Sequence, residues 1–184
     1  MEELVYVTSN LNKLNESEKI LEMKLKHADI DAPEIQAINV SEVVKEKAIY
    51  SYNILKKPVF VDDSGLYFNS MKGFPGALIK WLFKSVGNEG IFNIINNFKN
   101  KSAYAEVVIG YYNGINFESF SGKIDGEIVK PAGTNGFGWD AIFKVNENGK
   151  TFAQMTSEEK NLISMRKIAL IKFKDFLNKK NINQ

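Results

Sequence analysis

The sequence contains no cysteine, only four prolines, a single histidine and a single arginine. The lack of cysteine excludes disulfides and thiol chemistry, and one histidine leaves no cluster of zinc ligands. The chain has no run of about 18 apolar residues, so we expect no membrane span. A formal net charge of +2 over 184 residues does not favour a protein that binds nucleic acid through a broad basic face.

The first residues also lack the features of an export signal. Met1-Glu2-Glu3 is acidic and leads directly into Leu4–Val7, an apolar run with the pattern of a buried strand. Hydrophobic residues make up 44% of the chain, which is enough for a sizeable core. We therefore expect a cytoplasmic protein that folds as one domain or as two intimately joined lobes.

Two adjacent aspartates follow an apolar run in the first half of the chain. Val59–Val61 is typical of a buried strand, and Asp62 and Asp63 come next, before Ser64 and the turn residue Gly65. We expect the pair at the end of this strand, where open α/β sheets bind ligands, with the two side chains pointing to opposite faces. One carboxylate could hold a metal while the other handles a proton. The alternative is that both are solvated turn residues.

A polar segment, Thr8–Lys13, follows the first apolar run and leads into a predicted helix. The apolar positions of that helix are Leu14, Leu21, Leu25 and Ala28. Exposed N–H groups, a helix N-terminus and a lysine would suit an anion, although the glycines of a P-loop are missing. The alternative is simple N-capping by Ser9, Asn10 or Asn12.

The central segments predict further helices and a meander of strands. Ser41 could cap a helix over Glu42–Leu55, a second helix could cover Ala77–Phe83, and Asn88 could cap a third. The apolar stripe expected on the third helix is Ile91, Ile94, Ile95 and Phe98. Strands are predicted over Ala103–Tyr112 and Ile115–Phe120, joined by Asn113-Gly114, and over Gly122–Val129 with a turn or bulge inside it. A meander added to the first strands makes the sheet mixed.

Two segments near the C-terminus carry candidate ligand-binding residues. The glycine-rich segment Gly133–Asp140 offers Phe137 and Trp139, which could stack on a flat ring, or could instead pack into the core. Thr156-Ser157-Glu158-Glu159 is a capping box that opens the last helix. Lys160, Ser164 and Arg166 fall outside the apolar stripe of that helix, so they could bind a nucleotide or form a solvated face. Arg166, the sole arginine, offers a planar five-donor fork.

In this order the motifs resemble the inosine triphosphate pyrophosphatase family, especially its archaeal and eukaryotic members, over residues 4–177. The motifs are Thr8-x-Asn10-x-x-Lys13, Asp62-Asp63-Ser64-Gly65-Leu66, Gly73-x-Pro75-Gly76, Phe137-Gly138-Trp139-Asp140 and Glu159-Lys160-Asn161-x-x-Ser164-x-Arg166. The resemblance implies an α/β fold around a long mixed sheet, in which residues 1–184 form one domain of two intimately joined lobes. The nucleotide would bind in the cleft between the lobes. The resemblance also implies Mg²⁺-dependent hydrolysis of ITP, dITP and XTP to a monophosphate and pyrophosphate by a homodimer.

The resemblance further implies a role for each matching residue. The residues that would bind substrate are Thr8, Ser9, Asn10, Lys13, Lys47, Ser64, Lys80, Phe137, Gly138, Trp139, Asp140, Lys160, Ser164, Met165 and Arg166. Glu34 and Asp63 would bind Mg²⁺. Asp63 would orient and deprotonate a water that attacks the α-phosphorus, and Asp62 would be a second ligand or an orienting group.

Two positions depart from the family pattern: Met165 stands where the family usually has histidine, and Gln154 stands where glutamate is common. Methionine can pack on a purine but cannot donate a strong hydrogen bond to a 6-keto oxygen, which leaves Arg166 as the main donor. Two alternatives remain: a related pyrophosphatase for methylated or pyrimidine nucleotides, and a non-catalytic purine nucleotide-binding protein. An aspartyl phosphatase would need Asp-x-Asp at a strand end, whereas Asp29-x-Asp31 follows a helix-like run.

Overall fold

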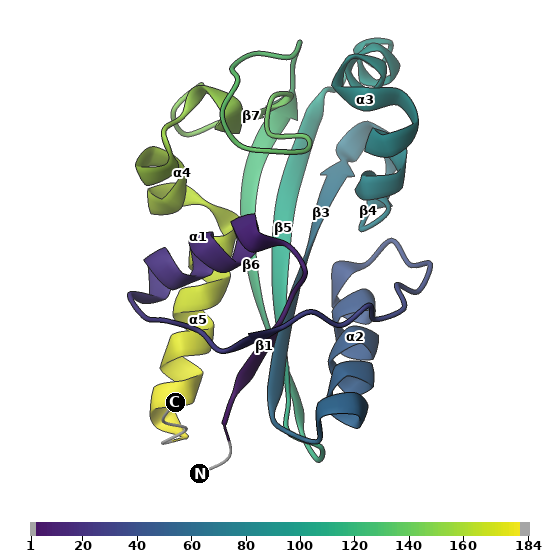
Figure 1. Ribbon diagram of the computed structural model, residues 1–184. Coiled ribbons are helices and arrows are strands. Elements are labelled where there is room, and N and C mark those ends of the chain that lie inside the picture. The colour runs from purple at the N-terminus through teal and green to yellow at the C-terminus, as the bar shows by residue number, and fades with distance from the viewer. Residues whose placement is uncertain (1–2, 181–184) are drawn as a thin grey trace.

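The computed structural model describes residues 3–180, which form an α/β fold around a seven-stranded mixed sheet (Figure 1). The strands are β1 (Val5–Val7), β2 (His27–Ala28), β3 (Val59–Phe68), β4 (Pro75–Gly76), β5 (Ser102–Tyr112), β6 (Phe117–Ile128) and β7 (Phe143–Val145). The helices are α1 (Leu11–Leu21), α2 (Val40–Leu55), α3 (Ile79–Asn96), α4 (Ser157–Ile163) and α5 (Met165–Lys179). The sheet order is β2-β1-β3-β5-β6-β7, with β4 paired to β3. The α/β class and the mixed sheet are as predicted.

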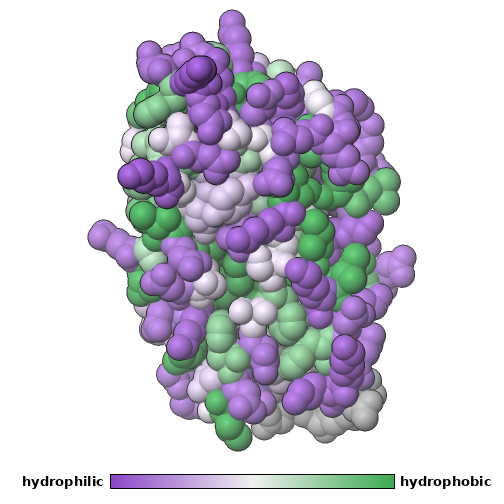
Figure 2. Space-filling view, turned by 180° about the vertical axis from the view of Figure 1, so that it is seen from behind, coloured by the Kyte–Doolittle hydropathy of each residue, from purple (hydrophilic) through white to green (hydrophobic). Residues whose placement is uncertain are grey.

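Helices cover the two faces of the sheet unequally. Helices α1 and α5 pack on one face and α2 packs on the other, while α3 and the α4 region stand at the far end of the long strands (Figure 1). The core on the α5 side includes Phe60, whose ring contacts those of Tyr6 and Phe173. Seen from behind, hydrophilic residues cover most of the surface, with smaller apolar areas between them (Figure 2). Within residues 3–180, no helix is long and apolar enough to cross a membrane.

The prediction that a strand ends at the two aspartates is wrong. Strand β3 runs through Asp62, Asp63 and Gly65 without a turn, because it pairs with β5 along its whole length. The strand that does end here is β1, whose last residue, Val7, pairs with Val61. The aspartates therefore still lie beyond the carboxyl end of a strand. A Cβ on Gly65 would come within 2.7 Å of a Val40 methyl, so this glycine serves close packing and not a turn.

The turn or bulge predicted in Gly122–Val129 is also wrong, because β6 is continuous and stays in register with β5. Gly122 and Gly126 have a different purpose. A side chain on Gly122 would collide with the backbone of α5 at Met165, and one on Gly126 would collide with β7. Glycine here allows other elements to approach the strand closely.

Several helix ends differ from the predictions. Helix α1 ends at Leu21, so Leu25 lies outside it and Ala28 belongs to β2; Asp29-x-Asp31 therefore follows a strand. Asn39 caps α2, two residues before the predicted Ser41. The two helices predicted around residues 77–98 form α3, which is interrupted by non-helical backbone at Gly87.

The last helix is divided in two. The capping box of Thr156 and Glu159 opens α4 as predicted, but α4 stops at Ile163. Ser164 then caps α5 by accepting a hydrogen bond from the Lys167 amide. This break turns Lys160 and Arg166 inward from two separate helices, and both are buried.

Candidate active site

Two neighbouring cavities open where β3 continues past the end of β1. The larger has a volume of about 390 Å³ and the smaller about 290 Å³, and Phe137 lines both. The predicted site residues that line the larger cavity are Thr8, Ser9, Asn10, Lys13, Glu34, Lys47, Asp62, Asp63, Ser64, Lys80, Phe137, Gly138 and Trp139. Lys160 lines the smaller one. The fold therefore gathers most of the predicted residues from distant parts of the chain.

The segment between β1 and α1 forms one end of the larger cavity. The Thr8 hydroxyl accepts a hydrogen bond from the Asn10 amide at 3.1 Å. Asn10 is the N-cap of α1, and its side chain accepts hydrogen bonds from the amides of Asn12 and Lys13. The capping alternative is thus confirmed for Asn10. Lys13 extends across the cavity and donates to the Asp62 carbonyl at 3.3 Å.

The two aspartates point to opposite faces of β3, as predicted, and have different surroundings. Asp62 is buried, and it contacts Tyr6 and Arg166. Burial opposes its charge, but the neighbouring Lys13 and Arg166 outweigh burial and hold the pKa of Asp62 well below its usual range. Asp63 remains part-exposed in the larger cavity, with Oδ2 at 3.2 Å from Lys47 Nζ. Asp63 can therefore meet a ligand, whereas Asp62 is held by protein groups.

Glu34 reaches the same cavity from the segment between β2 and α2. Its carboxylate lies 3.0 Å from Lys80 Nζ and 3.3 Å from Lys47 Nζ. Burial would raise the pKa of Glu34, but the hydrogen bond from Lys80 and the charge of Lys47 lower it overall. Burial likewise opposes the charge of Lys47, yet Asp63 and Glu34 raise its pKa. Acidic and basic side chains therefore alternate around the cavity.

The fit of a divalent cation can be tested on these carboxylates. No three His, Cys, Asp or Glu side chains within residues 3–180 are grouped so as to hold a metal. Glu34 Oε1 and Asp63 Oδ2, however, both lie within 3.3 Å of the same ammonium nitrogen, that of Lys47. Two carboxylates that converge on one cation suit Mg²⁺, which keeps several waters and needs only one or two protein carboxylates.

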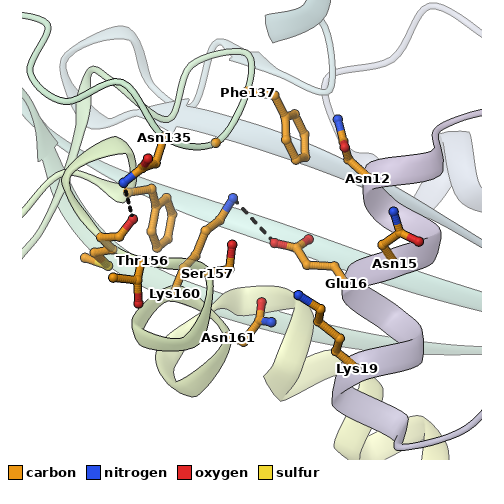
Figure 3. Close-up of a pocket in the computed structure, with 13 residues that line it drawn as sticks. Asn12, Asn15, Glu16, Lys19, Asn135, Phe137, Thr156, Ser157, Lys160 and Asn161 are labelled. Carbon is orange, nitrogen blue, oxygen red and sulfur yellow. Dashed lines mark hydrogen bonds and ion pairs between the residues drawn. The ribbon is translucent and has the colours of Figure 1, made fainter.

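The smaller cavity lies between α1 and the segments around Phe137 and α4 (Figure 3). Lys160 crosses it, with Nζ at 3.5 Å from Glu16 and 2.8 Å from Asp140. The same nitrogen lies 4.9 Å from the centre of the Phe137 ring and 5.3 Å from that of Phe152. Asp140 also accepts the Phe137 amide at 3.0 Å, which ties the glycine-rich segment to α4 through Lys160.

The two aromatic residues of the glycine-rich segment behave differently. Phe137 is 37% exposed, so its ring is available at the mouth of both cavities. Trp139 is nearly buried and packs against Phe143 and Phe152, although it also lines the larger cavity. The packing interpretation thus describes Trp139, whereas stacking on a ring stays a prediction for the exposed Phe137.

Four predicted residues line neither cavity: Asp140, Ser164, Met165 and Arg166. All four are buried, so the solvated-face interpretation of Ser164 and Arg166 is wrong. The Arg166 fork binds Asp62 through Nη2 at 2.9 Å and Glu16 through Nη1, while its Nε has no partner in the described residues.

The structure also shows cavity residues that the sequence analysis missed. In the smaller cavity these are Asn12, Asn15, Glu16, Lys19, Asn135 and Phe152 (Figure 3). Glu16 had a usable signal, because it lies three residues after Lys13 and therefore on the same face of the helix. Phe152 gave no local signal that distinguishes it from a core residue.

Comparison with known proteins gives a consistent result over almost the whole chain. The model of the Ham1 family matches residues 4–176. The chain is 40% identical to an inosine triphosphate pyrophosphatase of Schizosaccharomyces pombe, with 96% of each chain covered. It is 39% identical to a dITP/XTP pyrophosphatase of Thermococcus kodakarensis, with 95% of this chain and 96% of the relative covered.

Solved structures agree with the sequence comparisons. A HAM1 protein from Coxiella burnetii superimposes with a TM-score of 0.82 at 27% identity, covering 97% of this chain and 100% of its own. The Ham1 protein of Staphylococcus aureus gives 0.76 at 27% identity with the same coverage. The resemblance found in the sequence motifs is confirmed, and this chain belongs to the Ham1 family of inosine triphosphate pyrophosphatases.

Proposed function

We propose that this protein hydrolyses ITP, dITP and XTP to the nucleoside monophosphate and pyrophosphate. Relatives that carry the names inosine triphosphate pyrophosphatase and dITP/XTP pyrophosphatase match nearly the whole chain at about 40% identity. The observation that carries the proposal is the convergence of Lys13, Lys47 and Lys80 with Glu34 and Asp63 in one cavity, next to a second cavity with aromatic walls. Such a pair of cavities suits a ligand with a polyanionic part and a flat ring.

The larger cavity is the proposed triphosphate site. A triphosphate carries about four negative charges near neutral pH, since its terminal group has a second pKa of about 6 by analogy with phosphoserine. Lys13, Lys47 and Lys80 would neutralise much of this charge. Thr8, Ser9, Asn10 and Ser64 line the same cavity and offer hydroxyl and amide groups to phosphate oxygens.

We propose that Glu34 and Asp63 hold Mg²⁺ when substrate binds. The ion would add positive charge beside the phosphates and favour departure of pyrophosphate. Lys47 now occupies the position between these carboxylates, so binding would release it toward the phosphates. Asp63 is the proposed general base, since its carboxylate lies open in the cavity and could take a proton from a water that attacks the α-phosphorus.

Asp62 has a different proposed role from Asp63. Both of its oxygens contact protein groups, Oδ1 the Tyr6 hydroxyl and Oδ2 the Arg166 fork. These contacts favour an orienting role over the alternative of a second metal ligand.

The smaller cavity is the proposed site of the purine base. Phe137, which lines both cavities, and Gly138 and Trp139, which line the larger one, would flank the ring where the two cavities meet. Lys160 would reach the edge of the ring, held in place by Asp140. Ser164, Met165 and Arg166 would form the inner wall; they line neither cavity in this structure, so side chains would have to move before these residues could meet a ligand. Discrimination against ATP would come from donors that pair with a 6-keto oxygen and are left unpaired beside an amino group.

Pyrophosphate release tests the proposal. The substrates are ITP, dITP, XTP, GTP and ATP, each with and without Mg²⁺, and Asp63→Asn is the matched inactive control. We expect Mg²⁺-dependent release from the first three and much less from GTP and ATP. Activity only on methylated or pyrimidine triphosphates, or tight ITP binding without release, would replace the proposal by one of the two alternatives.

We also propose that the protein is a homodimer, as the family resemblance implies. Sedimentation equilibrium measures the mass of the particle in solution, and a mass of 20.8 kDa at all protein concentrations would contradict the homodimer.

A further inference from the structure

A buried tyrosine hydroxyl lies behind both cavities. Tyr6 on β1 is 1% exposed, and its ring stacks on that of Phe60 with centroids 4.4 Å apart. The hydroxyl donates a hydrogen bond to Asp62 Oδ1 at 2.6 Å. Burial and the charge of Asp62 raise the pKa of Tyr6, so the hydroxyl stays protonated and remains a donor.

The second oxygen of Asp62 is shared between two cations. Asp62 Oδ2 lies 2.9 Å from Arg166 Nη2 and 3.5 Å from Lys13 Nζ. A carboxylate can rotate easily about its bond to Cβ, because that torsion has broad minima. With Oδ1 fixed by Tyr6, this rotation is restricted and Oδ2 stays at one point between the two cations.

The contacts continue from Arg166 to the other end of the site. Arg166 binds Glu16, Glu16 lies 3.5 Å from Lys160, and Lys160 lies 2.8 Å from Asp140. Side chains of alternating sign therefore run without a break from Lys13, which lines the larger cavity, to Lys160, which lines the smaller one, and on to Asp140. In a buried chain of this kind each ion depends on the position of its neighbours.

We propose that Tyr6 is a positioning residue for the hydrolysis. Its hydroxyl fixes the Asp62 carboxylate, and Asp62 holds Lys13 and Arg166 in the positions from which they act on the substrate. Tyr6 lines neither cavity, so it acts through Asp62. This inference rests on the proposed function, because it needs Lys13 to bind the triphosphate.

Tyr6→Phe tests the inference, because it removes the hydroxyl and keeps the ring on Phe60. We expect kcat/KM for ITP with Mg²⁺ to fall about tenfold, the scale of a lost hydrogen bond to a charged group. Tyr67→Phe is the matched control. Tyr67 is also buried, stacks on Tyr104 with centroids 4.5 Å apart, and accepts the Val40 amide through its hydroxyl. Loss of the Tyr67 hydroxyl should lower the melting temperature about as much as loss of the Tyr6 hydroxyl does, but it should leave kcat/KM unchanged.

A double-mutant cycle separates positioning from mere stability. Lys13→Met should cost several-fold less in kcat/KM when Tyr6 is already phenylalanine than in the wild type, since the two act through the same carboxylate. In the Tyr67→Phe background its cost should equal that in the wild type. Asp62→Asn takes the place of Tyr6→Phe in the cycle if that variant does not fold.

The outcomes are distinct. An active wild type in which Tyr6→Phe matches Tyr67→Phe, with a fully additive cycle, overturns the positioning role alone. A wild type that releases no pyrophosphate from any of the five triphosphates overturns the proposed function. Loss of kcat/KM with a non-additive cycle supports both.

Discussion

Replacing Arg166 by methionine should destabilise the fold severely, independently of any effect on catalysis. The Arg166 and Asp62 side chains are only 4% and 3% exposed, and removing one member of a buried pair costs about 3–5 kcal/mol. The lower end applies here, because Asp62 would keep the Tyr6 hydroxyl and Lys13, and Glu16 would keep Lys160. We therefore expect a loss of about 3 kcal/mol in the free energy of unfolding.

Thermal unfolding measures this loss. For a chain of this size, 1 kcal/mol corresponds to about 2–4 °C, so the melting temperature should fall by about 6–12 °C. Lys150→Met is the control, since the Lys150–Glu159 pair has a similar distance of 2.8 Å but side chains 47% and 44% exposed. Exposed pairs contribute about 0–1 kcal/mol. A shift for Arg166→Met no larger than that for Lys150→Met would refute the reasoning.

Three further predictions follow from the site. Asp63→Asn should lower kcat for pyrophosphate release by at least about 10²-fold, as expected for a positioned base, and near-normal turnover would end that assignment. Glu34→Gln should raise the Mg²⁺ concentration for half-maximal activity about tenfold, because one charged ligand is lost; an unchanged Mg²⁺ titration would exclude Glu34 as a ligand. The lowered pKa of Asp62 means that its ionised form stabilises the fold above its ordinary pKa of about 3.9, and that this contribution is lost as pH falls further. In acid titrations of the melting temperature, Asp62→Asn should therefore fall less steeply below about pH 4 than the wild type, and parallel curves would contradict this sign.

Features with local causes could be predicted from the sequence. The capping box at Thr156 needs only residues within one turn, and the opposite directions of Asp62 and Asp63 follow from strand geometry alone. The Asn10 cap is of the same kind, although the sequence left three candidates open. The order of such motifs along the chain was specific enough to indicate the family.

Features with non-local causes could not be predicted in this way. Gly65 and Gly122 are glycines because other elements pack against them, and a single sequence does not distinguish that cause from a turn. The burial of Arg166 depends on Asp62 and Glu16, which lie 104 and 150 residues away from that arginine in the chain. Tyr6 lay within a predicted strand, and nothing in the sequence indicated that its hydroxyl donates to Asp62.

The glycine at position 122 has a consequence for Arg166, the second residue of α5. Since nothing projects from β6 at this point, the first turn of the helix rests directly on the strand, with the Met165 carbonyl against Gly122. A methyl group at residue 122 would displace that turn, and with it Arg166, which follows Met165 and binds Asp62. The position of the Arg166 guanidinium thus depends on the absence of a Cβ atom at residue 122. A survey of tolerated substitutions should find Gly122 as intolerant as residues that touch the ligand, although it lies outside both cavities.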